Sequence, residues 1–245
     1  MDDPNARIDP GAIKHPGWTA AGVIVMLAVI VAGVVLWARG SSEAVRISEP
    51  SLGAPVTLDG GRTAIPVEAT IANQSDEPIR VTELKVDVLS SRRVGACFTA
   101  PPEPDTVTGT YSVALPMQAG VPTTGVTTVP YTAEVPAGTG GRLAFTVGPQ
   151  TQDAGTVIVT VFRPVVVLDD GAELGLPSVA TATTPEGVQR YVDGVQALTA
   201  AERAAQSACA GGELATFDDV YGTSSLQDEP LKRLRESYTE LAGKN

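Results

Sequence analysis

An uncharged aliphatic run near the N-terminus constrains this chain more than any other sequence feature. No charged side chain occurs in residues 15–38, with His15 counted as neutral, and Trp18 and Trp37 flank the aliphatic centre. A helix rises about 1.5 Å per residue, so about 20 apolar residues cross a hydrocarbon core of about 30 Å. Indole rings favour membrane–water interfaces. The run predicts a transmembrane helix over residues 18–38, with the lipid bilayer as partner and Trp18 and Trp37 at the interfaces.

Two features of this segment leave alternatives open. Ser42-Glu43-Ala44 supplies small residues for signal cleavage near Ala44, which would make the body a secreted β-sandwich protein. The apolar stretch exceeds the roughly 7–15 residues of a signal core and ends in Trp37 and Arg39, which favours a retained anchor. Ala28 and Ala32 form a small-xxx-small pair. Such pairs arise by chance in a segment this rich in Ala and Gly, so homodimerisation is unsupported.

The flanking charges do not orient the segment. Arg7 and Lys14 precede it, whereas Arg39 and Arg46 follow it, which is a tie under the positive-inside rule. The body beyond it is rich in Thr, Val and Gly and poor in Lys, as suits an extracytoplasmic domain. We therefore expect a single-pass cell membrane protein whose N-terminus is cytoplasmic and whose C-terminal body is extracytoplasmic. The excess of Arg over Lys resembles coding by a GC-rich bacterial genome.

The charge of the chain argues against nucleic acid as a partner. The formal net charge is −11, and nearly all of it lies beyond the apolar segment. An acidic surface repels phosphate backbones and anionic headgroups. We therefore expect no nucleic-acid binding.

From residue 44 onward the hydrophobic pattern has period two. Val67, Ala69 and Ile71 alternate with more polar neighbours, as in a half-buried strand. A phase slip at Thr82-Glu83 predicts a β-bulge, and Asp169-Asp170-Gly171 predicts a hairpin turn. The expected strands cover residues 44–48, 55–58, 67–72, 79–88, 111–115, 127–135, 142–147, 156–168 and 172–176.

These strands predict a mainly β fold class with an antiparallel, immunoglobulin-like β-sandwich, because no helical pattern separates them. The likeness is architectural, since neither tryptophan lies among the strands to form the Cys–Trp–Cys core of immunoglobulin domains. Residues 99–110, which are rich in proline, and residues 116–125 are expected as loops. Solvated connections are the favoured interpretation, and recognition surfaces are the alternative.

The pattern becomes helical at Thr184-Pro185-Glu186, which is a strong helix start. The first helix is expected to end at Gly211-Gly212, and a loop is expected around Phe217–Leu226. A second amphipathic helix is expected from Asp228. Its apolar stripe consists of Leu231, Leu234, Tyr238 and Leu241. The stripe is expected either to pack on the chain's own body, which is favoured, or to form a docking face for another protein.

Two cysteines, Cys97 and Cys209, lie more than 100 residues apart. In an oxidising compartment they would close one disulfide, and the alternative is two separate thiols. The sequence does not decide whether Cys97 and Cys209 are bonded to each other.

Catalytic chemistry finds no support in the sequence. His15 is the only histidine and lies beside the apolar run, so the body lacks the histidine of a Ser–His–Asp triad or a His-containing zinc site. Asp169-Asp170 and Asp218-Asp219 lack the alternating spacing of a calcium loop. We predict no catalytic, cofactor-binding or metal-binding residues and a protein that is not an enzyme.

The sequence predicts five parts: a cytoplasmic tail (1–17), a transmembrane helix (18–38), a linker with the first strand (39–50), a β-sandwich (51–181) and a helical region (182–245). The expected function is a membrane-anchored extracytoplasmic protein that binds or scaffolds a protein partner in a bacterial envelope. A sensory or regulatory membrane protein acting through a partner is the alternative.

Overall fold

The computed structural model describes the body of the chain. The described residues are 44–48, 50–58, 62–95, 97, 112–118, 121–150 and 157–243. The expected transmembrane segment with Trp18 and Trp37, and the expected loop 99–110, lie outside this part of the chain. Among the described helices, none combines the length and the apolar character that a membrane crossing requires. Val45–Asn245 form one compact unit.

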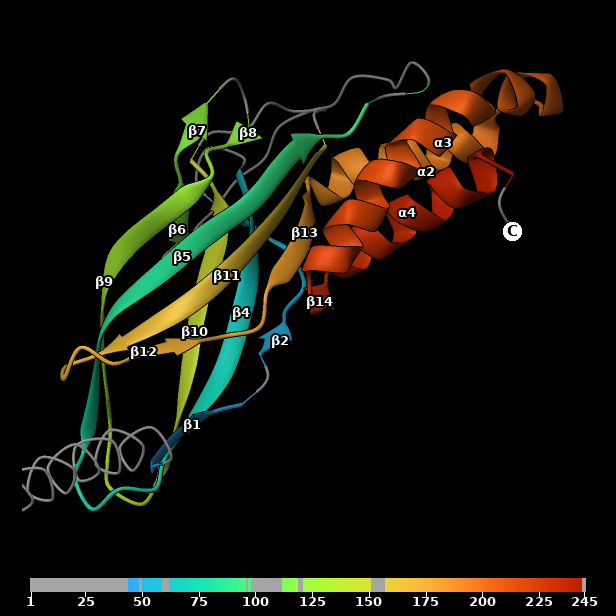
Figure 1. Ribbon diagram of the computed structural model, residues 1–245. Helices are drawn as coiled ribbons and strands as arrows, with labels where there is room; N and C mark the ends of the chain where they lie inside the picture. The colour runs from blue at the N-terminus through green and yellow to red at the C-terminus, as the bar shows by residue number, and fades with distance from the viewer. Residues whose placement is uncertain are drawn as a thin grey trace, which may run out of the picture. The chain divides into compact units, whose positions relative to one another are not determined.

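The described part of this unit contains two six-stranded sheets and a small hairpin (Figure 1). The first sheet runs in the order β1 (Val45–Ile47), β4 (Arg62–Asn73), β10 (Gly140–Pro149) and β6 (Ser112–Leu115), with β2 (Ser51–Leu52) and β3 (Val56–Leu58) also paired to β4. The second runs in the order β14 (Leu226–Gln227), β13 (Val179–Thr183), β11 (Ile158–Leu168), β5 (Ile79–Arg93) and β9 (Gly125–Val135), with β12 (Glu173–Gly175) paired to β11. The hairpin pairs β7 (Met117–Gln118) with β8 (Val121–Pro122).

The two large sheets share a hydrophobic core, which confirms the mainly β prediction. The alternating residues Val67, Ala69 and Ile71 of β4 point into this core from one sheet. Val86 of β5 and Phe162 of β11 are buried in it from the other sheet. Burial of one face of each strand explains the period-two pattern of the sequence.

Local predictions in the strands are confirmed. The pairing of β5 with β9 is irregular between Val81 and Glu83, where the phase slip predicts a bulge. The Asp169-Asp170-Gly171 turn joins β11 to β12, and Gly171 has a φ of 82°, a backbone conformation that favours glycine. Asp170 Oδ1 accepts a hydrogen bond of 2.8 Å from the N–H of Ala172 within the same turn.

The sheets are not wholly antiparallel, which corrects one expectation. β6 pairs in parallel with β10, and β13 pairs in parallel with β14. The strand β13 is itself absent from the predicted strands, because its sequence Val-Ala-Thr-Ala-Thr lacks large apolar residues. All five of its residues are buried, since it has the sandwich on one side and helices on the other.

Three C-terminal helices replace the two that were expected. They are α2 (Pro185–Ala197), α3 (Ala200–Thr223) and α4 (Glu229–Leu241). The predicted starts at Thr184 and Asp228 are confirmed, because each side chain caps its helix by accepting a backbone hydrogen bond.

The expected helix end at Gly211-Gly212 is wrong. The helix α2 ends at Ala197, and a capping box of Thr199 and Glu202 starts α3. This start signal was missed in the sequence. Both glycines lie inside α3, which continues to Thr223 through most of the expected loop at Phe217–Leu226. Glycine costs only about 1 kcal/mol in a helix interior, which the packing of Leu214 and Phe217 in the core below outweighs.

The helices cover one end of the second sheet through a second core, as Figure 1 shows beside β13. Val159 and Val161 of β11 and Ala180 and Ala182 of β13 form its sheet side. Small alanines on β13 let the helices approach the sheet closely. The strand β11 therefore contributes to two cores, with its first half (Val159 and Val161) in the helical core and its second half (Phe162, Val166 and Leu168) in the sandwich core.

This packing decides between the two expectations for the α4 stripe in favour of the chain's own body and against the alternative docking face. Leu231, Leu234 and Tyr238 are 0% exposed and Leu241 is 2% exposed. All four side chains belong to the core between the helices and the sheet. An apolar stripe at helical spacing is buried when it packs against an apolar sheet face. The stripe is not open to another protein.

Candidate functional site

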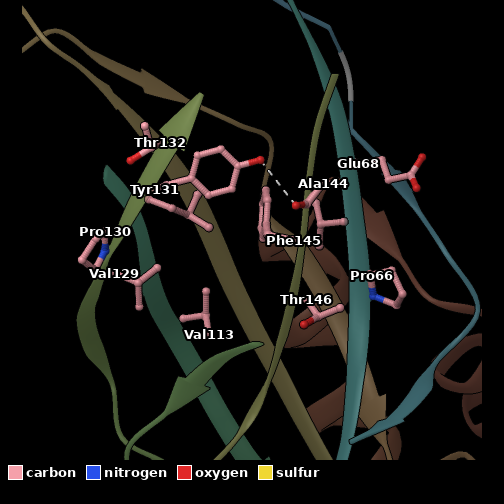
Figure 2. Close-up of a pocket in the computed structure, with 12 residues that line it drawn as sticks. Pro66, Glu68, Val113, Val129, Pro130, Tyr131, Thr132, Ala144, Phe145 and Thr146 are labelled. Carbon is pink, nitrogen blue, oxygen red and sulfur yellow. Dashed lines mark hydrogen bonds between the residues drawn. The ribbon is translucent and has the colours of Figure 1, made fainter. Parts of the chain in front are cut away.

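An open groove of about 820 Å³ lies between β9 of one sheet and β10 of the other (Figure 2). Val129 and Tyr131 of β9 form one wall, and Phe145 of β10 lies opposite. Leu84 and Val113 also line it from the core side. A concave, mainly apolar surface of this volume is the usual form of a ligand-binding site, so this groove is the candidate site.

Among the described residues, no strand pairing joins the two sheets along this seam. The strand β9 is the last described strand of its sheet, and the described part of β6 pairs with β10 along Thr146–Pro149. Across the opening, the Tyr131 hydroxyl donates a 3.5 Å hydrogen bond to the Ala144 carbonyl oxygen, as Figure 2 shows. Tyr131 and Phe145 are each half-buried against the sandwich core, so both present ring surface to the groove.

The groove is electrically neutral in its described lining. Glu68 is the one charged residue that lines it, and Arg142 pairs with the Glu68 carboxylate. Thr132 and Thr146 add hydroxyl groups at the rim. This lining suits an uncharged, apolar occupant rather than an ionic one.

A second hollow on the outer face of the second sheet is polar. Lys85 pairs with Glu173 at 2.5 Å, and Arg163 pairs with Asp87 at 3.1 Å. The hydrogen bond that the Lys85 ammonium donates to the Glu173 carboxylate raises the pKa of Lys85. In each of these exposed cross-strand pairs the two opposite charges cancel, and each pair stabilises the sheet by roughly 0–1 kcal/mol. The pairs therefore leave no net charge for binding an ionic ligand.

The acidic pairs considered in the sequence have structural partners. Asp170 supports the hairpin turn, and Asp218 accepts a 2.7 Å hydrogen bond from Arg235 across α3 and α4. Among the described residues, no group of three His, Cys, Asp or Glu side chains converges on one point. Asn73-Gln74-Ser75 matches the N-glycosylation pattern, but Asn73 is buried at the end of β4, and its side-chain amide donates to the carbonyl oxygens of Glu77, Val135 and Pro136.

Asp228, which the sequence indicates only as a helix start, is a buried carboxylate. It is 3% exposed, and it accepts hydrogen bonds from the N–H of Leu231 at 2.9 Å and from the N–H of Ala182 at 3.2 Å. Burial raises the pKa of Asp228 to about 7. The carboxylate links α4 to β13 and faces no cavity that the structure describes, so its role is in folding.

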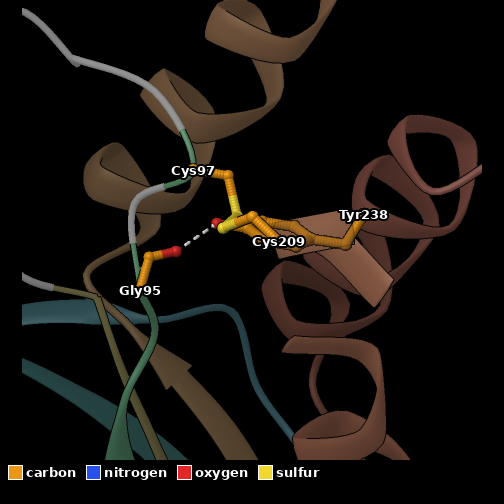
Figure 3. Close-up of a disulfide and its surroundings, with 4 residues drawn as sticks. All are labelled: Gly95, Cys97, Cys209 and Tyr238. Atoms are coloured by element: carbon orange, nitrogen blue, oxygen red, sulfur yellow. Dashed lines mark hydrogen bonds between the residues drawn. A yellow bond between two sulfur atoms is a disulfide. The ribbon is translucent and has the colours of Figure 1, made fainter. Parts of the chain in front are cut away.

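The two cysteines form a disulfide (Figure 3). The Cα atoms of Cys97 and Cys209 are 5.9 Å apart, a typical separation for a disulfide. The bond ties the segment after β5 to α3, and the structure thereby decides between the two alternatives that the sequence leaves open.

The groove residues Tyr131 and Phe145 were missed as site residues. Both fall inside strands that the sequence predicts, over residues 127–135 and 142–147. Alternation places them on the inner faces of their strands, but no sequence signal shows that these two strands form the open seam.

Comparisons with known proteins give distant structural likeness and no match to a protein family or a curated protein. No protein-family profile matches the chain, and no curated protein matches it. Two solved structures with partial likeness are a Northeast Structural Genomics Consortium target, at 8% identity over 54% of this chain and 80% of that chain, with a TM-score of 0.27, and a protein from Archaeoglobus fulgidus, at 10% identity over 56% of this chain and 94% of that chain, with a TM-score of 0.31.

Proposed function

We propose that this chain is a single-pass, membrane-anchored protein whose immunoglobulin-like body lies outside the cytoplasm and binds another protein of a bacterial cell envelope through the groove between β9 and β10. It acts by binding or scaffolding and not by catalysis. The observation that most supports this proposal is the neutral, apolar groove that Tyr131 and Phe145 line at an open seam of the sandwich.

The chemistry of the groove favours binding over catalysis. Acid–base catalysis needs titratable groups directed at a substrate. The charged lining residue Glu68 is instead occupied by Arg142. The aromatic rings of Tyr131 and Phe145 offer large contact areas, which is the property that makes aromatic residues frequent anchors at protein interfaces.

The disulfide supports the extracytoplasmic location. Disulfides form and persist in oxidising compartments and are rare in the cytosol. Cys97 is 5% exposed and is bonded to Cys209. The uncharged run at residues 15–38 supplies the anchor on this proposal.

Membrane attachment and topology are tested on the full-length chain in a GC-rich bacterial host. We expect the protein to stay in the membrane fraction after alkaline extraction, and we expect protease added to spheroplasts to digest the body. Release by alkali would argue against the anchor, and protection of the body from protease would argue against the orientation.

Binding at the groove is tested by placing a photo-crosslinking residue at Tyr131 or, as a matched control, at Val126. Val126 lies on the same strand but is 61% exposed and lines the polar outer hollow instead of the groove. We expect a discrete adduct from position 131 and none of the same mass from position 126. Equal adducts from both positions would contradict a binding role for the groove.

A further inference from the structure

The two ends of the disulfide lie in unlike surroundings. Cys209 is an exposed residue of α3, whereas Cys97 is 5% exposed and belongs to the core under the helices. In thiol–disulfide exchange a thiolate attacks one of the two sulfur atoms, and access decides which one it reaches. The Sγ atom of Cys209 is therefore the point of attack for a thiol that approaches from solvent.

The first half of α3 contributes no buried side chain. The buried side chains of this helix all lie in its second half, and they are Ala210, Leu214, Phe217 and Val220. Residues 200–208 are exposed or half-buried. Cys209 thus lies at the boundary between a solvated half-helix and a packed one, and there the disulfide fastens α3 to the segment that follows β5 (Figure 3).

The other described attachments of this half-helix are polar contacts of Arg203. Its guanidinium donates to the carbonyl oxygens of Gln196 at 3.1 Å and Leu198 at 3.2 Å, and it pairs with Glu240 of α4. Exposed ion pairs contribute little to stability. Among the described contacts, the covalent bond at Cys209 is therefore the strongest restraint on the first half of α3.

The packing of α4 does not depend on either sulfur atom. Leu231 and Leu234 are fully buried in the core that contains Ala182 of β13, and the Asp228 carboxylate accepts a hydrogen bond from the N–H of Ala182. Parts of one protein that differ in buried apolar surface open at different free-energy costs. Breaking the disulfide should therefore loosen the first half of α3 and leave α4 on the sheet.

We propose that Cys209 is a site of thiol–disulfide exchange, at which a dithiol protein of the cell envelope opens the bond to Cys97 and frees the first half of α3. This inference rests on the proposed function for its compartment, because the bond and the dithiol must lie on the same side of the membrane. It assigns to the disulfide a role that can be switched, in addition to its stabilising role.

The exchange balances in two steps. A thiolate of the dithiol forms a new S–S bond with the Sγ atom of Cys209, and the bond from Cys209 to Cys97 breaks. The Cys97 sulfur leaves with the electron pair and takes up a proton. The second thiol of the dithiol then attacks the mixed disulfide, which releases Cys209 as a thiol. The dithiol is oxidised to its own disulfide, and the disulfide of this chain is reduced.

Trapping on the wild-type, full-length chain in phospholipid nanodiscs tests the exchange site. The probe is a thioredoxin-type Cys-x-x-Cys protein whose second cysteine is replaced by serine, so that the mixed disulfide cannot resolve. We expect a covalent adduct on Cys209, with Cys97 free to take an alkylating label, as read by mass spectrometry. An adduct on Cys97, or no adduct in the absence of denaturant, overturns the proposal.

Two matched variants compare the sulfur atoms directly. Cys97→Ser leaves the thiol of Cys209, and Cys209→Ser leaves the thiol of Cys97. We expect a maleimide to react with Cys209 about tenfold faster or more, because access controls thiol reactivity at equal thiolate character. Equal rates, or a faster reaction at Cys97, overturn the proposal. If either variant fails to fold, trapping on wild type still decides.

Release of α3 is measured by hydrogen–deuterium exchange with mass spectrometry, before and after reduction by a phosphine. We expect peptides within residues 200–208 to exchange about tenfold faster or more after reduction, and peptides within 231–238 to stay within about twofold. Equal acceleration of both regions, or no change in either, overturns the local release. The control is the double variant Cys97→Ser and Cys209→Ser, which should exchange like reduced wild type with or without the phosphine.

Failure of this inference differs from failure of the proposed function. Trapping and exchange use the purified chain and need neither the membrane orientation nor the groove. A groove adduct from position 131 without a trapped adduct at Cys209 preserves groove binding and refutes the exchange site. A trapped adduct together with a body that resists protease in spheroplasts supports exchange at Cys209 but overturns the extracytoplasmic location, and with it an envelope dithiol as the reductant.

Discussion

The hydroxyl of Tyr238 donates a 2.7 Å hydrogen bond to the carbonyl oxygen of Gly95. This bond joins α4 to the segment that follows β5, beside the disulfide between Cys97 and Cys209 (Figure 3). Tyr238 also packs edge-on against Phe217 of α3, with ring centroids 5.6 Å apart. One buried side chain therefore holds two helices and the end of a central strand together.

Removing only the hydroxyl of Tyr238 should separate its polar and apolar contributions. We expect Tyr238→Phe to lower the free energy of unfolding by about 1 kcal/mol through the lost hydrogen bond. Tyr238→Ala should lower it by about 3–5 kcal/mol, because it also leaves a cavity in the core. Urea denaturation measures both values. Equal losses in the two variants would contradict a packing role for the ring.

The disulfide should stabilise the body by closing a long loop. Cys97 and Cys209 are separated by 112 residues, and in the loop-entropy account closing such a loop contributes about 4–5 kcal/mol. We expect the double variant Cys97→Ser and Cys209→Ser to lose roughly 2–5 kcal/mol in urea denaturation under oxidising conditions. Dithiothreitol should destabilise wild type and leave the double variant unchanged. A wild type that is insensitive to reduction would contradict the bond.

Asp228 should make stability depend on pH. Burial raises its pKa from the usual 3.8 to about 7, so the native state retains a proton that the unfolded state releases. This contribution is complete below about pH 4 and is lost as the pH rises through 7. We expect wild type to lose on the order of 4 kcal/mol relative to Asp228→Asn between pH 4 and pH 8, measured by urea titrations at each pH.

The control for Asp228 is Asp219→Asn, at an exposed carboxylate of α3. Its stability should follow wild type across the same pH range. If the free energies of unfolding of wild type and Asp228→Asn differed by the same amount at every pH, the Asp228 carboxyl would have the same pKa in the native and the unfolded state.

Gly148 should be required where β10 lies beside β4. A Cβ atom there would lie 2.7 Å from the Thr63 carbonyl oxygen and 3.0 Å from the Ala64 Cα. Because backbone cannot yield as a flexible side chain does, we expect Gly148→Ala to cost about 1–3 kcal/mol. Gly175→Ala is the matched strand control, since nothing lies within 4 Å of its Cβ. Comparable melting temperatures for the two variants would refute the steric argument.

Features encoded by neighbouring residues were predictable. The alternation of β4, the bulge near Thr82, the Asp169-Asp170-Gly171 turn and the helix starts at Thr184 and Asp228 depend on residues a few positions apart. Their hydrogen bonds and steric limits are local, so the pattern of residue types determines them. The transmembrane helix over residues 18–38 stays a prediction from the sequence, since it lies outside the described residues.

Partnerships between distant segments were decided only by tertiary structure. The sequence leaves open whether the Leu231 stripe faces a partner or the body, and packing against Ala180 and Ala182 buries it. It leaves the pairing of Cys97 with Cys209 open, and the fold brings the two sulfur atoms together. In the described part of the chain, the groove lies where β9 of one sheet faces β10 of the other, two strands that the sequence does not place side by side. Burial and strand pairing depend on which surfaces meet in three dimensions, and no single stretch of sequence contains both surfaces.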